Sequence, residues 1–186
     1  TLDAHLSPLQ THYIDGPVTL TNNGHTIQAS EPADTRDTIT LDKQTWTLQQ
    51  FHFHSPSENT VHGKKYAMEM HLVHKNAAEL TVVAVMFDKG AANPELEKLW
   101  SVMPQLAEQN VSIKGDLNLN TLLPEDKTYF RFSGSLTTPP CSEGVTWIVL
   151  KHPMTVSAEQ LDKFTHTMHH DNNRPVQSLH GRVVVE

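Results

Sequence analysis

Gln50-Phe51-His52-Phe53-His54 and Met68-Glu69-Met70-His71-Leu72-Val73 are the two stretches that decide the fold of this chain. Both lie in segments rich in β-branched and aromatic residues, which predict β-strands. Side chains two residues apart in a strand point to the same side, so His52 and His54 share a face. If the two strands are neighbours, His71 can join them. The pattern therefore predicts a sheet that gathers three imidazoles on one face.

Three neutral imidazoles at one point are typical of a catalytic Zn²⁺ site with an open fourth position. The sequence has 13 histidines, so a His-x-His pair can also be structural or solvent-facing. The residues before the histidines favour the metal. Gln50 lies two residues before His52, and Glu69 lies two before His71, so each can accept a hydrogen bond from the other ring nitrogen. Such partners fix the tautomer of a metal-binding histidine, and we predict zinc ligands at His52, His54 and His71.

The composition is that of an ordinary globular domain, with 186 residues, 37% of them hydrophobic and 19% charged. A net charge of -7 without basic runs argues against a nucleic-acid or anionic-membrane partner, so we expect a small substrate. No apolar stretch approaches the length of a membrane span. Residues 1–5 show neither an initiator methionine nor signal-peptide character, and we expect a processed or truncated chain.

Most of the chain is predicted to form short strands separated by turns. The predicted strands are 38–41, 45–53, 66–73, 80–87, 129–132 and 145–150. We expect a mixed α/β, β-dominated domain, built on a large, mostly antiparallel twisted sheet.

Two helices are predicted on the outside of this sheet. Asn93-Pro94 supplies a cap and a first-turn proline for a helix that ends near Pro104. Its apolar stripe, which we assign to the core, consists of Leu96, Leu99, Trp100 and Met103. Ser157-Ala158-Glu159-Gln160 is a capping-box start for the second helix, whose apolar face holds Leu161 and Phe164.

Seven motifs follow one another from near the start of the chain to near its end. They are Asn22-Asn23-Gly24-His25, Gln50-Phe51-His52-Phe53-His54, Ser57-Glu58-Asn59-Thr60-Val61, Glu69-Met70-His71-Leu72-Val73-His74, Gly134-Ser135-Leu136-Thr137-Thr138-Pro139-Pro140, Val145-Thr146-Trp147 and Asn173-Arg174-Pro175. Together they resemble the α-class carbonic anhydrases, and specifically the exported bacterial members. The resemblance implies one α-carbonic anhydrase domain over residues 1–186. It also implies that the family's N-terminal portion, which helps to close the cavity rim, is missing.

The resemblance implies a zinc enzyme that reversibly hydrates carbon dioxide to bicarbonate and a proton by zinc-bound hydroxide. It assigns the zinc to His52, His54 and His71, with Gln50 and Glu69 as their hydrogen-bond partners. Thr137 matches the threonine that accepts a hydrogen bond from the hydroxide, and Glu58 matches the carboxylate that accepts from that threonine. Because a threonine hydroxyl has one proton, donation to Glu58 would turn its lone pairs toward the hydroxide.

Carbon dioxide needs an apolar wall beside the metal. The positions that match this wall in the family are Val73, Val82, Leu136, Thr138, Val145 and Trp147. Val73 lies two residues after His71, so strand alternation also places it on the face of the ligands. Without the resemblance, these residues would be assigned to ordinary core packing.

The reaction must also pass a proton to solvent, a task that suits a histidine with a pKa near 6.5. His25 matches the family's proton shuttle, although a histidine after an Asn-Gly turn would otherwise be assigned to an exposed loop. His74 lies three residues after His71 and therefore on the opposite strand face, where the family has a packed structural histidine. We assign His169 and His170 to a solvated helix end rather than to a second metal site.

Cys141 is the only cysteine, and composition alone leaves it either buried and inert or separated from its partner. The resemblance implies that it pairs with a cysteine of the missing portion, in a periplasmic protein whose signal peptide has been removed. Two alternatives to an enzyme remain. One is a non-catalytic, carbonic-anhydrase-like binding module, and the other is a structural zinc site with a fourth protein ligand.

Overall fold

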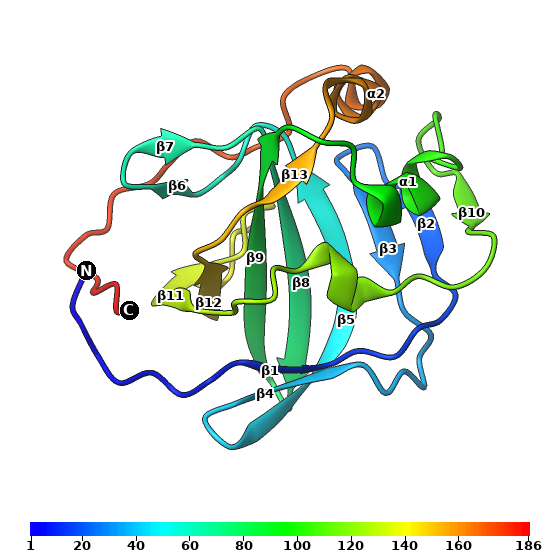
Figure 1. The fold of residues 1–186 in the computed structure, drawn as a ribbon. Helices are drawn as coiled ribbons and strands as arrows, with labels where there is room; N and C mark the ends of the chain where they lie inside the picture. The colour runs from blue at the N-terminus through cyan, green and yellow to red at the C-terminus, as the bar shows by residue number, and fades with distance from the viewer.

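The computed structural model describes residues 1–186 and is dominated by a twisted sheet of 11 strands (Figure 1). Its strands are β1 (Gln10–His12), β2 (Thr19–Asn22), β3 (Ile27–Ser30), β4 (Thr38–Leu41), β5 (Gln44–His54), β8 (Met68–Asn76), β9 (Glu79–Lys89), β10 (Asn110–Ser112), β11 (Tyr129–Ser135), β12 (Glu143–Leu150) and β13 (Met154–Val156). The main path of the sheet is β10-β2-β3-β5-β8-β9-β12-β11. A separate hairpin consists of β6 (Thr60–Val61) and β7 (Lys64–Lys65).

The predicted fold class is confirmed. All six predicted strands are present, and only β12 and β13 run parallel to their neighbour β9. The remaining short strands were not predicted, because segments of two to four residues carry too little alternation to stand out from turns. Asn22-Asn23-Gly24 forms the turn between β2 and β3, as its composition indicates.

Strand alternation divides β5 between two environments. Phe51 and Phe53 are fully buried in the main hydrophobic core on one face of the sheet. The neighbouring residues His52 and His54 therefore point to the opposite face, where a smaller apolar cluster forms. That cluster is Tyr66, Val73, Val82, Ala84, Met86, Phe130, Val145, Trp147 and Val149.

Both helices cover the face that carries Phe53. Helix α1 (Pro94–Trp100) and helix α2 (Ala158–Met168) meet there through Trp100, whose ring lies 4.8 Å from Phe53 and 5.7 Å from Phe164. The predicted Asn93 cap and the capping box at Ser157 are both present. Helix α1 ends at Trp100 rather than near Pro104, so Met103 is buried beyond the helix. No helix is both long and apolar enough to cross a membrane.

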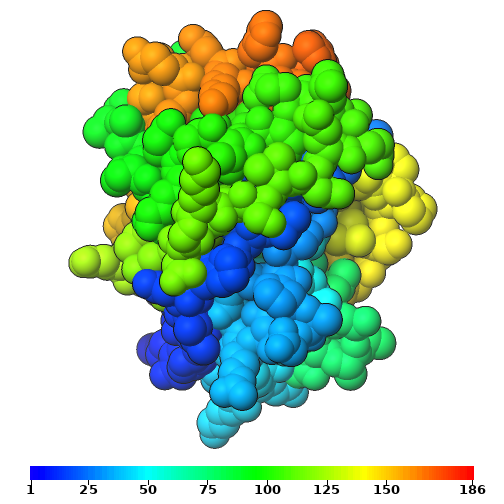
Figure 2. All heavy atoms as spheres, turned by 90° about the vertical axis from the view of Figure 1, so that its right-hand side faces the viewer, coloured from blue at the N-terminus to red at the C-terminus, as the bar shows by residue number.

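The two ends of the chain lie side by side (Figure 1), where Leu2 pairs with Val185. From there the N-terminal segment runs along the surface to β1, which pairs with β4. Figure 2 shows this segment, in blue, between the β4–β5 hairpin in light blue and the green segments that follow β9. A short 3-10 turn, η1 (Leu119–Leu122), lies against it, and Asn120 Nδ2 donates to the Tyr13 carbonyl at 2.9 Å.

His74 is a packed residue on the sheet face opposite to His71, as predicted. The Tyr13 hydroxyl lies 2.8 Å from its Nε2 atom, and burial lowers the pKa of His74 to about 4, so the ring is neutral. Nearby, Asp37 accepts a hydrogen bond from the Ile14 amide at 2.8 Å. Burial and, next, the Asp37 carboxylate raise the pKa of Glu31 to about 7.

Replacing Glu31 with Gln should stabilise the protein at pH 8 and leave it unchanged at pH 4. The folded-state pKa of Glu31 lies above its ordinary value of 4.5, so the unfolded chain loses this proton first. Stability is therefore lost as pH rises from about 4.5 to about 7. After a discount for solvent screening, we expect a gain of about 1 kcal/mol, or roughly 3 °C in Tm, at pH 8. Thermal unfolding at both pH values measures this, with exposed Glu79→Gln as control; an equal shift at pH 4 and pH 8 would contradict it.

Candidate metal centre

The pairing register of β5 and β8 brings the three predicted ligands together. His52 lies directly opposite His71 in this antiparallel pair, and His54 lies opposite Glu69. The ring centroids are 5.0 Å apart for His52 and His54, 5.4 Å for His52 and His71, and 4.8 Å for His54 and His71. One nitrogen from each ring lies within 4.8 Å of the other two. The sequence therefore located this cluster correctly.

Each ring has its second nitrogen against a hydrogen-bond acceptor. His52 Nδ1 lies 2.7 Å from Gln50 Oε1, and His71 Nε2 forms a short contact with Glu69 Oε2. His54 Nδ1 donates to the Asn172 backbone carbonyl at 3.0 Å. Since a carbonyl or carboxylate oxygen only accepts, each ring carries its proton on that side. The lone pairs of His52 Nε2, His54 Nε2 and His71 Nδ1 are left for a metal.

Asn172 is the one partner that the sequence did not indicate. It is separated from His54 by 118 positions, and the acceptor is a backbone oxygen, which any residue type could supply. Gln50 and Glu69 could be predicted because strand alternation links them to their histidines two residues away. No local spacing connects Asn172 to the site.

Burial disfavours the charged forms of His52 and His71. His71 and Glu69 are almost completely inaccessible to solvent. Burial, with His54 beside it, lowers the pKa of His71 to about 3, and burial followed by the two neighbouring rings lowers the pKa of His52 well below its ordinary value. Burial raises the pKa of Glu69 to about 6, while hydrogen bonds from Asn59 and Glu58 act in the opposite direction. At neutral pH His52 and His71 are therefore neutral imidazoles, and the Glu69 carboxylate lies behind His71.

Glu58 lies beside the cluster, and only one of its two carboxylate oxygens accepts a hydrogen bond. Its Oε2 atom accepts from the Arg174 backbone amide, whereas Oε1 is buried without a hydrogen-bond partner. Oε1 lies 3.4 Å from His54 Nε2 and 3.8 Å from His71 Nδ1, but it does not belong to the group whose atoms are all within 4.8 Å. Glu58 is therefore a neighbour of the centre and not a fourth ligand within it.

An apolar cavity of about 190 Å³ opens in front of the histidines. It is lined by Gln50, His52, His71, Val73, Val82, Leu136, Thr137, Thr138 and Trp147. Five of the six predicted wall residues are in this set. The sixth, Val145, is buried in the same apolar cluster as Val73, Val82 and Trp147. The Trp147 ring lies 4.8 Å from His71 and packs on Gly134, where a Cβ atom would come within 2.9 Å of the ring. Gly134 thus allows the indole to form part of the cavity wall.

A larger cavity, of about 690 Å³, lies on the other side of Thr137 and Trp147. It is bounded by the β6–β7 hairpin, β11 and both chain ends, and Glu58 and Arg174 also line it. Thr137 therefore faces both spaces. Its hydroxyl forms no hydrogen bond in the structure, and the predicted donation to Glu58 stays a prediction.

His25 is exposed at the edge of the site, on the turn between β2 and β3. The Asn23 side chain shapes this turn, because its Oδ1 atom accepts from the His25 and Thr26 amides, each at 2.9 Å. Gly24 has a φ of +82°, in the left-handed region that favours glycine. A second link ties the turn to β5, since Thr26 Oγ1 donates to the Phe53 carbonyl at 2.6 Å. His25 is therefore solvent-accessible yet held close to the ligand strand.

The donor set fits zinc. His54 Nε2 is buried and has no hydrogen-bond partner, which is costly in a protein interior unless a metal uses the lone pair. No further group of three or more histidine, cysteine or acidic side chains in residues 1–186 is placed to hold a metal. His169 and His170 are exposed at the end of α2, with His169 as its left-handed C-cap. The three-histidine group leaves room for a non-protein ligand and does not favour a closed structural site.

Comparisons with known proteins agree with this centre. A family model described as eukaryotic-type carbonic anhydrase matches residues 1–186. A carbonic anhydrase of Klebsiella pneumoniae is 70% identical over 187 residues, covering 100% of this chain and 76% of the relative. The α-carbonic anhydrase structure from Thermovibrio ammonificans, in complex with sulfanilamide, has a TM-score of 0.96 at 47% identity and covers 100% of this chain and 81% of that one. The Photobacterium profundum α-carbonic anhydrase has a TM-score of 0.95 at 48% identity, covering 100% of this chain and 85% of that one. The chain therefore belongs to the eukaryotic-type, or α-class, carbonic anhydrase family.

Proposed function

We propose that this chain carries out the reaction of its family, the reversible hydration of carbon dioxide to bicarbonate and a proton, in the cavity beside His52 and His71. The observation that carries the proposal is the set of three ring nitrogens left free by the acceptors behind them. A non-catalytic binding module would not need this arrangement, and the intact triad does not favour that alternative.

Zinc is the cofactor of this family, and His52, His54 and His71 would hold it. When bound, it supplies a Lewis acid that lowers the pKa of its water to about 7, which makes the water nucleophilic at neutral pH. This pKa is the established value for carbonic anhydrase, and we adopt it. Gln50, Glu69 and the Asn172 carbonyl keep the three rings in the tautomer and orientation that binding requires.

The apolar lining supports carbon dioxide as the substrate. Val73, Val82 and Trp147 are buried beside the histidines and offer a linear, uncharged molecule contact without a competing hydrogen bond. The cavity of about 190 Å³ is small and excludes bulky substrates. Bicarbonate, being charged and hydrated, is held less well by these surfaces, which favours its release.

Glu58 and Thr137 supply the orientation step in this proposal. Glu58 Oε1 is a buried acceptor without a partner, and such an atom is stabilised by a donor. The Thr137 hydroxyl lines the same wall as Glu58 and has one proton to give. Donation to Glu58 leaves only lone pairs toward the substrate cavity, so Thr137 would accept from the attacking water and fix its direction.

His25 would move the proton to solvent. It is exposed, lies on the turn tied to β5 through Thr26 and Phe53, and carries an imidazole, the side chain that most often transfers protons in enzymes. The reaction produces one proton per turnover, and this proton must pass from the buried centre to buffer. Its transfer through His25 would therefore limit kcat when buffer is dilute.

Replacing His71 with Ala should remove both zinc and activity, because two imidazoles remain where three are needed. We expect zinc content to fall from one atom per chain to near zero, and stopped-flow CO2 hydration to fall to the buffer background. His5→Ala, at an exposed histidine, serves as the matched control. Circular dichroism verifies that both variants are folded. A folded, zinc-free His71→Ala protein that still hydrates CO2 would refute the proposal.

Replacing His25 with Ala should slow turnover only where proton transfer limits it. In weak buffer we expect kcat to fall by about 100-fold, the lower end of general acid–base effects, with kcat/KM nearly unchanged. Added imidazole should restore kcat by carrying the proton in place of the side chain. Stopped-flow measurements over a range of buffer concentrations test this, and a kcat independent of buffer in both proteins would exclude His25 as the shuttle.

We also propose that the protein is exported to the periplasm after signal-peptide removal and that Cys141 forms a disulfide there. The resemblance to exported bacterial members supports this, together with the place of Cys141 on a partly exposed loop. Its partner would lie outside the sequence of residues 1–186, which has one cysteine. Alkylation and mass spectrometry of the periplasmic fraction should find Cys141 protected until a reductant is added. Protein found only in the cytoplasm, or an alkylated Cys141 without reduction, would contradict the proposal.

A further inference from the structure

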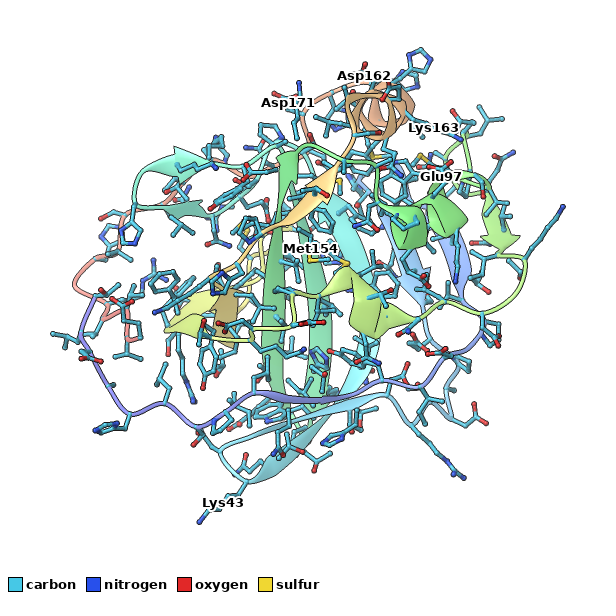
Figure 3. The ribbon with its side chains drawn as sticks, viewed as in Figure 1. Lys43, Glu97, Met154, Asp162, Lys163 and Asp171 are labelled. Carbon is cyan, nitrogen blue, oxygen red and sulfur yellow. The ribbon has the colours of Figure 1, made fainter.

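Asn172 connects three segments that are distant in sequence. It follows Asp171, which Figure 3 labels beside α2, and lies where the chain leaves that helix for the edge of the sheet. Its side-chain Nδ2 donates to the His25 carbonyl at 3.0 Å and to the Phe53 carbonyl at 2.9 Å. Its Oδ1 accepts from the Ser55 amide at 2.8 Å. Both amide protons and the amide oxygen are therefore in use.

We propose that the Asn172 side chain is a positioning residue that holds the His25 turn in place relative to the ligand His54. This inference rests on the proposed role of His25 as proton shuttle. The same NH2 group bonds the carbonyl of the shuttle residue and the carbonyl of the residue before the ligand. One planar amide thereby fixes the separation between the backbone of the shuttle residue His25 and the backbone of Phe53, which precedes the ligand His54.

The backbone and the side chain of Asn172 have separate tasks. The backbone carbonyl accepts from His54 Nδ1 and the backbone amide donates to the Ser55 carbonyl at 3.3 Å, contacts that any residue type can keep. The contact with His25 requires a side-chain donor at this position, which only the amide nitrogen supplies. A side-chain substitution at Asn172 therefore removes the hydrogen bond to the His25 turn. It keeps the backbone carbonyl that accepts from the metal ligand His54.

The rest of the turn stays anchored without Asn172. Thr26 bonds the Phe53 carbonyl and also accepts from the Phe53 amide at 3.2 Å, and β3 pairs with β5 from Gln28 onward. Loss of the Asn172 side chain should therefore loosen the tip of the turn, where His25 lies, rather than detach the strand. Variants at position 172 are expected to fold.

The test compares Asn172→Ala and Asn172→Asp with Asn173→Ala, the adjacent asparagine, whose side chain makes no hydrogen bond within the chain. The aspartate keeps an acceptor for Ser55 and removes both donors. In weak buffer we expect kcat to fall roughly tenfold in both variants, the scale of one or two lost hydrogen bonds, with kcat/KM within about twofold and imidazole restoring kcat. Zinc content should stay at one atom per chain.

Hydrogen exchange gives a readout that does not depend on activity. Amides 23–27 should exchange roughly tenfold faster in both Asn172 variants than in Asn173→Ala, with or without zinc. Unchanged exchange, or a kcat equal to that of Asn173→Ala, would overturn the inference. Loss of zinc, or a kcat that imidazole does not restore, would also overturn it, because Asn172 would then act through His54.

The double variant His25→Ala/Asn172→Ala separates this inference from the shuttle assignment. If Asn172 acts through His25, removing its side chain should not lower kcat further when His25 is already absent. An additive loss would overturn the inference. If His25→Ala alone has no buffer-dependent effect, the shuttle assignment fails, while hydrogen exchange still reports whether Asn172 holds the turn.

Discussion

The antiparallel pairing of His52 with His71 is the constraint on which the rest of the structure depends. In this register β5 presents Phe51 and Phe53 to the main core, and β8 presents Met70 and Leu72 to the same core. The histidines consequently face the other side together. A slip by one residue would bury imidazoles against Trp100 and expose phenylalanines, so packing of the aromatic face specifies the metal face. The hydrophobic core and the metal centre are two results of one pairing.

The sequence predicted the parts of this arrangement that follow from local periodicity. Residue composition and alternation identified six of the strands, the shared face of His52 and His54, and the partners Gln50 and Glu69. The order of motifs along the chain, compared with a family, then indicated six wall residues, five of which line the cavity beside the histidines. The roles that it gives to Thr137 and Glu58 stay predictions. Val145 is buried in the cluster that also holds Val73, Val82 and Trp147, but it does not line this cavity. Most short strands escaped prediction, because strands of two to four residues are stabilised mainly by the neighbours with which they pair.

Long-range backbone contacts were beyond the reach of sequence analysis. The carbonyl of Asn172 fixes His54, and the amide of Arg174 fixes Glu58, although both residues lie well over a hundred positions from their partners. A backbone atom has no residue signature, so only the three-dimensional path of the chain after α2 reveals it. The capping box at Ser157 and the packing of Phe164 on Trp100 set where that path begins. Helix placement thereby determines the geometry of a site on the other side of the sheet.

Burial of this many polar groups is tolerated because nearly every one has a partner. Glu69 accepts from the amides of Glu58 and Asn59 and from the Asn59 side chain, besides its contact with His71, so its charge is distributed over several donors. Six buried side-chain atoms have no hydrogen-bond partner: Trp46 Nε1, His54 Nε2, Glu58 Oε1, His74 Nδ1, Thr81 Oγ1 and Asn118 Oδ1. Of these, His54 Nε2 and Glu58 Oε1 lie 3.4 Å apart at the histidine cluster. These two are the ones that lie beside the ring nitrogens left free for a metal, so their lack of partners fits interactions reserved for the metal and for the reacting groups. The same accounting of hydrogen bonds that explains the stability of the site therefore also locates its chemistry.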